Sequence, residues 1–328
     1  MLSFIARRIL YMIPTFFAVS IVAFAIIQLP PGDFLTTLVA SMASQGEKID
    51  PAAMEALRIR YGLGEPLWVQ YIKWMSNIFL RGDFGQSFEW NQPVISLIWS
   101  RLILTFFLSL ATLLFVWAVA LPIGIYSAVR QYSLGDYTFT FLGFIGLAIP
   151  NFLLALVLMY VGFKYFNQSV GGLFSPEYQE AAWTWAKFVD MMSHLWIPVV
   201  IIGLSGTASL IRVMRANLLD ELHKPYVVTA RAKGLPESQV IMRYPVRVAL
   251  NPFVSTIGWV LPALISGEAI ISIVLSLPTT GPLLLRSLMS QDMYLAGSFI
   301  LMLSTLTIIG TLLSDILLAL LDPRIRLE

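Results

Sequence analysis

The stretch that decides the fold is residues 102–129, LILTFFLSLATLLFVWAVALPIGIYSAV, which contains no charged residue. A helix that crosses the apolar core of a bilayer needs about 20 consecutive, mostly apolar residues. A strand in the same place would leave its backbone groups without hydrogen bonds in lipid. The stretch therefore predicts a transmembrane helix.

Other apolar runs of similar length lie on both sides of this stretch. Together they predict six spans, at residues 9–29, 102–129, 137–162, 195–211, 252–275 and 295–321. The first run follows Arg7 and Arg8 as a signal peptide would, but it exceeds the 7 to 15 residues or so of a signal-peptide core. We therefore expect an all-α membrane protein with six spans and both termini on one side.

The composition excludes several classes of function. The chain is 58% hydrophobic and only 12% charged, with a mean hydropathy of +0.79, whereas about a quarter of residues are charged in soluble domains. It has no cysteine, only His194 and His223, and no G-x-x-x-x-G-K-[ST] loop for nucleotide phosphates. We expect no catalytic residue, no metal site and no cofactor bound by this chain.

Basic residues indicate the orientation of the spans. Twelve of the 21 Lys and Arg residues lie in the termini and in the connections after the second and fourth spans. They are Arg7, Arg8, Arg130, Arg212, Arg215, Lys224, Arg231, Lys233, Arg243, Arg247, Arg324 and Arg326. Because short cytoplasmic segments carry the excess of Lys and Arg, we expect both termini to be cytoplasmic.

Residues 30–101 form a first external segment that is long enough to be a subdomain. We therefore divide the chain into residues 1–29, this segment, and a five-helix core at 102–328. Within the external segment, one helical face would carry Leu67, Trp68, Tyr71, Ile72, Met75, Ile78 and Phe79. This face suits a helix lying along the membrane surface, or one packed on neighbouring spans.

The longest cytoplasmic segment, residues 212–251, holds seven of the twelve basic residues. Apolar residues recur there at helical spacing, at Leu218, Leu219, Leu222, Tyr226, Val227 and Ala230. Gly234 and Pro236 suit a helix end and a new helix start. We expect a helix, a tight turn and two further helices. On these residues alone the segment could dock on another protein, fold under its own bundle, or anchor lipid headgroups.

Several motifs resemble one protein family in the same order along nearly the whole chain. They are LPPGDF (29–34), LRIRYGLGEPLWVQYIKW (57–74), RGDFGQSF (81–88), AIPNFLLAL (148–156), YVVTARAKGL (226–235), RYPVRVALNP (243–252) and LDPRIR (321–326). The chain resembles ABC importer permeases, specifically the first permease of the oligopeptide, dipeptide and nickel family.

The resemblance implies a type I permease architecture in the bacterial inner membrane. It also implies partners: a second homologous permease, two ATPase subunits that carry ATP and Mg, and a periplasmic or lipid-anchored binding protein. Family members insert a short helix of this segment into a cleft of the ATPase subunit. The corresponding residues here are Tyr226, Thr229, Ala230, Arg231, Ala232, Lys233, Gly234, Leu235 and Pro236. The family's acidic residue is absent, and Val228 and Thr229 take its place.

Two residues within the predicted spans have possible functional roles. Glu268 would be costly in lipid, so it either meets the translocation path or makes a structural hydrogen bond. Pro150 should kink the third span, as a hinge or as a static bend. Asp315 is expected to be structural, near Arg324 and Arg326. Such isolated carboxylates make a poor proton relay, which disfavours an ATP-independent transporter or channel; a membrane-anchored structural subunit is another alternative.

The connection at residues 276–294 bears on the cargo. Pro282 is expected to begin a short helix through Leu288, and Ser290 or Asp292 to cap the sixth span. Its LPTTGPLLL sequence differs from the PGLG-like version of peptide permeases and resembles some oligosaccharide importers. The sequence therefore predicts an importer of oligopeptide-like solutes, with oligosaccharide or nickel as alternatives.

Overall fold

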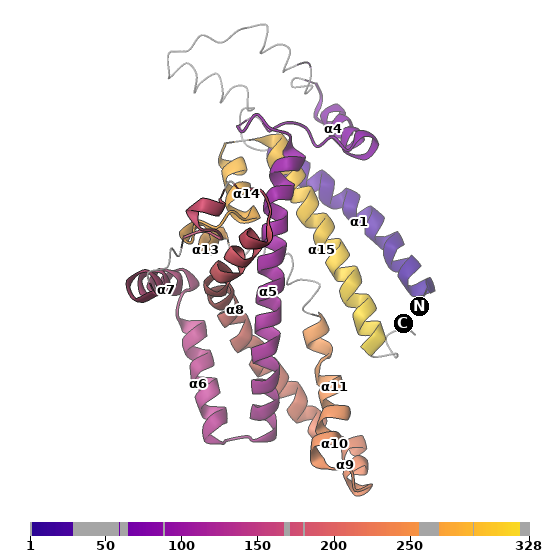
Figure 1. Cartoon of the computed structure of the whole chain (residues 1–328). Coiled ribbons are helices and arrows are strands. Elements are labelled where there is room, and N and C mark those ends of the chain that lie inside the picture. Colours follow the sequence, from indigo (N-terminus) through magenta and orange to yellow (C-terminus); the bar gives the residue numbers. More distant parts are fainter. Residues whose placement is uncertain are drawn as a thin grey trace. The chain divides into compact units, whose positions relative to one another are not determined.

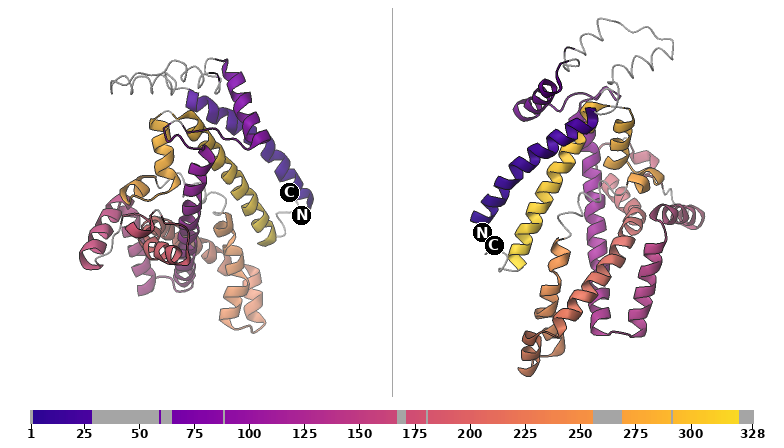
Figure 2. Two further views of the ribbon diagram at one scale, coloured as in Figure 1. Left: turned by 45° about the horizontal axis from the view of Figure 1, so that its top comes forward. Right: turned by 180° about the vertical axis from the view of Figure 1, so that it is seen from behind.

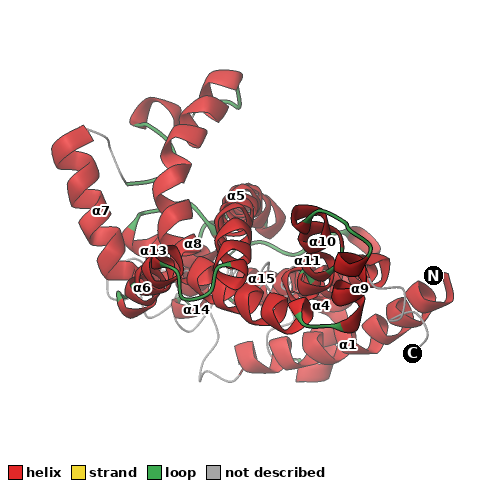
Figure 3. Ribbon diagram, turned by 90° about the horizontal axis from the view of Figure 1, so that it is seen from below, coloured by secondary structure: helices red, strands yellow, loops and turns green. Residues whose placement is uncertain are grey.

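A computed structural model of the chain describes residues 2–28, 59, 65–87, 89–166, 171–179, 181–255, 269–290 and 292–321. Regular structure in these ranges is helical, apart from one isolated bridge between Gln86 and Pro93 (Figures 1 and 3). The elements are α1 (Leu2–Gln28), α4 (Leu67–Arg81), α5 (Val94–Val129), α6 (Leu134–Ala148), α7 (Asn151–Phe166), η1 (Pro176–Tyr178), α8 (Trp185–Leu222), α9 (Pro225–Ala232), α10 (Glu237–Arg243), α11 (Pro245–Ala249), α13 (Ala269–Val274), α14 (Thr280–Met289) and α15 (Met293–Leu321). The all-α prediction is confirmed for these residues.

Four described helices, α1, α5, α8 and α15, are long and apolar enough to cross a membrane. They contain most or all of the predicted first, second, fourth and sixth spans. At 38 residues, α8 is about 57 Å long, whereas the apolar core of a bilayer is about 30 Å thick. This helix is therefore long enough to extend well beyond the apolar core of a bilayer. Much of the predicted fifth span, residues 256–268, lies outside the described residues.

The predicted third span is two helices rather than one kinked helix. The α6 and α7 helices meet at an angle of 99°, and together they count as a fifth span only if the bent pair crosses the membrane as one. Ile149 is extended, with φ −81° and ψ 121°, because the ring of the following Pro150 disfavours the helical conformation there. The sequence located the break correctly but underestimated its size.

Contacts divide the chain into two compact units, and the first comprises Met1–Arg8, Thr105–Pro278 and Thr307–Glu328. Within it, α6 and α8 run side by side, with α5 against them (Figures 1 and 2). Arg215 of α8 binds the buried carboxylate of Asp136 of α6, with an Nη2–Oδ2 distance of 3.1 Å. Asp315 pairs with Arg8 at 3.1 Å; its expected neighbours, Arg324 and Arg326, lie outside the described residues.

The second unit comprises Ile9–Leu104 and Thr279–Leu306, and α4 belongs to it. The buried side chains of α4, Trp74 and Met75, pack with Leu301 of α15 and with aromatic residues of α1. The hydroxyls of Tyr71 and Ser20 are 2.7 Å apart and hydrogen-bonded. Leu67, Trp68, Ile72 and Phe79 remain exposed. The apolar side chains of α4 are thus divided between packing on spanning helices and an exposed face.

The connection before α15 follows the sequence prediction closely. Pro282 lies in the first turn of α14, and Asp292 caps α15 by accepting a hydrogen bond from the Leu295 backbone at 3.1 Å. The same carboxylate, fully buried, accepts a hydrogen bond from the Ser87 hydroxyl at 2.5 Å. Asp292 thereby ties Ser87, in the segment before α5, to the start of α15.

Candidate docking segment

The predicted cytoplasmic segment begins inside α8 and continues through α9, α10 and α11. The sequence predicts one continuous helix across residues 218–230, but α8 ends at Leu222 and α9 begins at Pro225. Lys224 is extended, with φ −69° and ψ 148°, because it precedes a proline. The apolar spacing continues across this break and therefore conceals it.

The α9 and α10 helices fold against each other as a hairpin, residues 225–243, which we call the docking hairpin (Figure 1). Its small core consists of the buried residues Val227, Ala230 and Val240. Gly234 allows the turn because it has a φ of +76°, a conformation that L side chains rarely adopt. An added Cβ at Gly234 would have no atom within 4 Å, so this part of the turn is open.

A bidentate ion pair joins the two helices of the hairpin across the turn. Arg231 donates from Nη2 to Glu237 Oε1 at 2.7 Å, and its Nε lies 3.1 and 3.2 Å from the two carboxylate oxygens. This hydrogen bond lowers the pKa of Glu237 and raises that of Arg231. Both side chains are about half exposed, so the pair contributes modestly to stability, roughly 0.2 to 1 kcal/mol.

A second polar contact ties α9 back to α8. The Tyr226 hydroxyl donates a hydrogen bond to the Glu221 carboxylate. Burial, followed by this bond to an anion, raises the pKa of Tyr226, so the phenol stays protonated at physiological pH. The contact holds the first turn of α9 against the end of α8.

The structure places the predicted docking residues on one hairpin, but with different exposure. Tyr226, Thr229, Arg231, Ala232, Lys233, Gly234 and Pro236 are exposed, and Leu235 is half-buried. Ala230 is buried in the hairpin core, so its small side chain serves internal packing and does not offer a free contact surface. Val228 was not predicted, although its side chain is 57% exposed on α9. The sequence did contain a signal for this residue: Val228 is apolar at a position where the family has an acidic residue.

An apolar core connects the segment firmly to the long helices. Met214 and Leu218 of α8 pack with Ile241 of the hairpin itself, and with Val246 and Phe253 from the part of the chain that follows it. Buried alanines of α5 complete the cluster. Since packed interiors transmit displacement with little compression, a force on the hairpin would be carried to α5 and α8.

The other predicted site residues lie elsewhere. Pro150 stands at the break between α6 and α7. Glu268 lies outside the described residues. No group of three or more His, Cys, Asp or Glu side chains that could hold a metal ion occurs in the described part of the chain.

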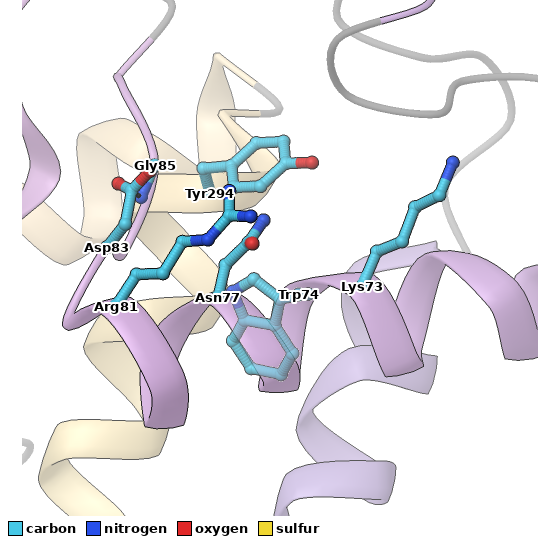
Figure 4. Close-up of a pocket in the computed structure, with 7 residues that line it drawn as sticks. All are labelled: Lys73, Trp74, Asn77, Arg81, Asp83, Gly85 and Tyr294. Atoms are coloured by element: carbon cyan, nitrogen blue, oxygen red, sulfur yellow. Dashed lines mark hydrogen bonds between the residues drawn. The ribbon is translucent and has the colours of Figure 1, made fainter.

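A polar pocket beside α4, in the second unit, was not predicted. It has a volume of about 250 Å³ and is lined by Lys73, Trp74, Asn77, Arg81, Asp83, Gly85 and Tyr294. Arg81 and Asn77 lie close together near Tyr294, while Lys73 stands apart (Figure 4). The buried indole nitrogen of Trp74 has no hydrogen-bond partner among the described residues. Six of these seven residues lie between Lys73 and Gly85, and Lys73, Asn77 and Arg81 recur every four residues on one face of α4, a signal that was available in the sequence. Tyr294 is distant in the sequence, and no spacing pattern indicates its contribution.

Comparison with known proteins identifies the family. The family described as "Binding-protein-dependent transport system inner membrane component" matches residues 120–327, and the corresponding N-terminal family matches residues 1–111. The chain is 35% identical to an oligopeptide transport system permease protein of Bacillus subtilis (strain 168), over 99% of this chain and 100% of the relative. It is 30% identical to a dipeptide transport system permease protein of Escherichia coli (strain K12), over 99% of both chains.

A third relative is named for a different cargo. The chain is 29% identical to a peptidoglycan transport system permease protein of Agrobacterium fabrum, over 99% of this chain and 98% of the relative. The helical fold and these matches over the whole length agree. The chain belongs to the inner-membrane components of binding-protein-dependent transport systems, and it is a permease subunit of an ABC importer.

Proposed function

We propose that the docking hairpin is the point at which this permease receives the work of ATP hydrolysis. One observation carries the proposal: the hairpin is exposed, and an apolar core packs its base against the long helices α5 and α8. A partner that moves the hairpin would move α8, and with it the helices packed on α8. Alternating access then requires that ATP and the loaded binding protein each favour one conformation by differential contact.

The proposed topology has six spans, with both termini and residues 212–251 in the cytoplasm. It is supported by four long apolar helices, by the bent α6–α7 pair as a fifth span, and by the position of the basic residues. Residues 252–275 would supply the remaining span. The long segment 30–101 would then face the periplasm, and residues 102–328 would form the permease core.

We assign ATP and Mg to partner subunits, since this chain has no phosphate-binding loop. The working importer would contain a second homologous permease, two ATPase subunits and a binding protein on the outer side. Glu268 would line or brace the translocation path, and Pro150 would serve as a hinge at the α6–α7 break.

The proposed cargo is a peptide. Several relatives are named as oligopeptide or dipeptide permeases, which supports this choice over oligosaccharides or nickel. Uptake of labelled peptides and oligosaccharides, compared in cells with and without the chain, tests it. Loss of oligosaccharide uptake alone would contradict a peptide cargo.

The docking role is tested by Val228→Arg, which places on the exposed face of α9 a charge opposite in sign to the family's acidic residue, without touching the hairpin core. We expect loss of the ATPase subunits on purification and loss of uptake, with normal membrane insertion. Val248→Arg is the matched control, because Val248 is also exposed, at 41%, but lies on α11. Equal loss in both variants, or none in either, would refute the role of α9.

The open turn allows a second, independent variant. Gly234→Trp would project a bulky side chain into space that the chain leaves empty, and it should also prevent ATPase binding. Gly234→Asn is its control, since asparagine tolerates positive φ better than most residues. Normal uptake by Gly234→Trp would show that the turn does not enter a partner's cleft.

A further inference from the structure

The N-terminal end of α6 and the adjoining part of α8 line an open pocket that the docking function does not use. It has a volume of about 340 Å³ and is lined by Tyr132, Asp136, Tyr137, Thr140, Arg212 and Arg215. A shallow surface groove, with only about 10 Å³ of internal volume, adjoins it and shares Thr140 and Arg212, so a chain could lie along this groove but not inside it. The remaining groove residues are apolar: Phe139, Gly143, Phe144, Leu147, Ala208 and Ile211.

The charge of the pocket is unbalanced. Arg215 is neutralised by the buried Asp136 carboxylate through two hydrogen bonds of 3.1 and 3.2 Å. Arg212 is exposed, and its guanidinium makes no ion pair or hydrogen bond with any residue in the part of the chain described. One positive charge therefore remains free at the pocket wall, beside the fixed pair.

The level of the pocket along α8 corresponds to the boundary of a bilayer. No Asp, Glu, Lys or Arg lies between Asp190 and Arg212, so Arg212 is the first charge after the apolar part of the helix. Tyr132 and Tyr137 are 71% and 59% exposed. Tyrosines are typical of the headgroup level of membranes, where the ring is partly apolar and the hydroxyl reaches water.

The groove leads from this level toward the apolar part of both helices. The groove is deepest at Gly143, because this residue has no side chain. Ala208 lies opposite it, and a Cβ added at Gly143 would be 3.5 Å from the Ala208 Cβ. A charged wall at the headgroup level, continued by an apolar groove, matches the two ends of a phospholipid. A soluble anion would use only the first of these features.

We infer that α6 and α8 bind an anionic phospholipid, with its phosphate headgroup on Arg212 and an acyl chain along the groove. The Asp136–Arg215 pair holds the two helices at the spacing that the lipid requires. The choice of leaflet rests on the proposed topology, but the preference for a negative headgroup does not. Basic pockets between membrane helices are known to take such headgroups.

Native mass spectrometry of the full chain, purified with its transport partners, tests the headgroup. Phosphatidylglycerol should bind more tightly than phosphatidylcholine. Arg212→Gln should weaken phosphatidylglycerol binding about fivefold, which corresponds to about 1 kcal/mol for one basic residue at a lipid surface. Arg130→Gln removes the same charge from the turn before α6, outside the pocket, and should leave the preference unchanged. Equal binding of both lipids, or equal effects of both variants, would overturn the inference.

The groove is tested separately with a lipid that carries a thiol-reactive acyl chain. Because the chain has no cysteine, Leu147→Cys gives a single reactive site in the groove. It should react faster with a phosphatidylglycerol probe than with a phosphatidylcholine probe. Leu142→Cys, on the same helix but outside the groove and also exposed, should not discriminate between the two. Cross-linking of Leu147→Cys to a neighbouring protein subunit in place of lipid would refute the site.

Discussion

Gly124 of α5 allows a close approach between α5 and α8, and its replacement by alanine should loosen the base of the docking segment. A Cβ at Gly124 would lie 2.6 Å from the Met214 Cβ, 2.8 Å from its Cγ and 3.2 Å from the Ile211 carbonyl oxygen. The Met214 Cβ cannot swing away as a side-chain tip can. The two helices would therefore have to move apart.

The size of the effect follows from a matched control. Gly206 lies on α8 against the same helix, but its added Cβ would be 3.7 Å from Val116, an ordinary contact. Both Gly→Ala changes gain about 1 kcal/mol of helix propensity, whereas overpacking costs only Gly124→Ala about 1 to 3 kcal/mol. The difference between the variants should therefore be about 1 to 3 kcal/mol. For a chain of this length, this corresponds to roughly 1 to 5 °C in melting temperature.

Thermal unfolding of the purified chain in detergent, followed by tryptophan fluorescence, measures this difference. We expect Gly206→Ala to melt at or above the unmodified protein, and Gly124→Ala to melt below Gly206→Ala. If Gly124→Ala melts as high as Gly206→Ala, the close approach of α5 and α8 is not as the distances require. The mechanical link from the docking hairpin to α5 would then lose its support.

Three further predictions concern separate parts of the chain. Asp292→Asn should lower the free energy of unfolding by about 1 to 3 kcal/mol in a denaturant titration, because it weakens the buried hydrogen bond from Ser87. The Arg231–Glu237 pair should contribute fully above the usual Glu pKa of 4.5 and be lost as the pH falls through the lowered pKa, which hydrogen exchange of the hairpin would detect. Pro150→Ala should reduce transport without reducing the abundance of the protein.

Each of these has a contrary outcome. Unchanged unfolding of Asp292→Asn would mean that the carboxylate charge is not needed at this cap. Hairpin exchange that responds to pH equally in Glu237→Gln would assign the response to another group. Equal losses of abundance and transport in Pro150→Ala would make the α6–α7 break a static feature of the fold.

The long helices could be predicted from the sequence because lipid imposes a simple rule on composition. Uncharged runs such as residues 102–129 must be helical in a bilayer, and α5 contains that run. The positions at which these helices end were predicted less accurately. A span predicted from hydropathy ends where polar residues begin. The α8 helix continues beyond that point to Leu222, because it packs there on α11 and α5.

The break at Pro150 shows the limit of local rules. A proline removes one hydrogen bond and restricts the preceding residue, which locates a bend but does not fix its angle. The angle of 99° depends on what α7 packs against after the break. In the structure α7 contacts α13, which is more than 100 residues away in the sequence.

The docking hairpin was predictable in position but not in internal arrangement. Gly234 indicated the turn because few other residues accept its backbone conformation. The fold of the hairpin determines which small residue is exposed, and it buries Ala230 against Val240. The Arg231–Glu237 pair joins residues six apart across a turn, a spacing that is not typical of any single helix.

The most direct test of the coupling role uses the absence of cysteine from the native chain. Val228→Cys places one thiol on the exposed face of α9, and Val248→Cys places one on α11 as the control. We expect a short thiol-reactive cross-linker to join Val228→Cys, but not Val248→Cys, to an ATP-hydrolysing subunit in membranes. Failure of Val228→Cys to reach that subunit, while the assembled importer still transports its cargo, would contradict the account.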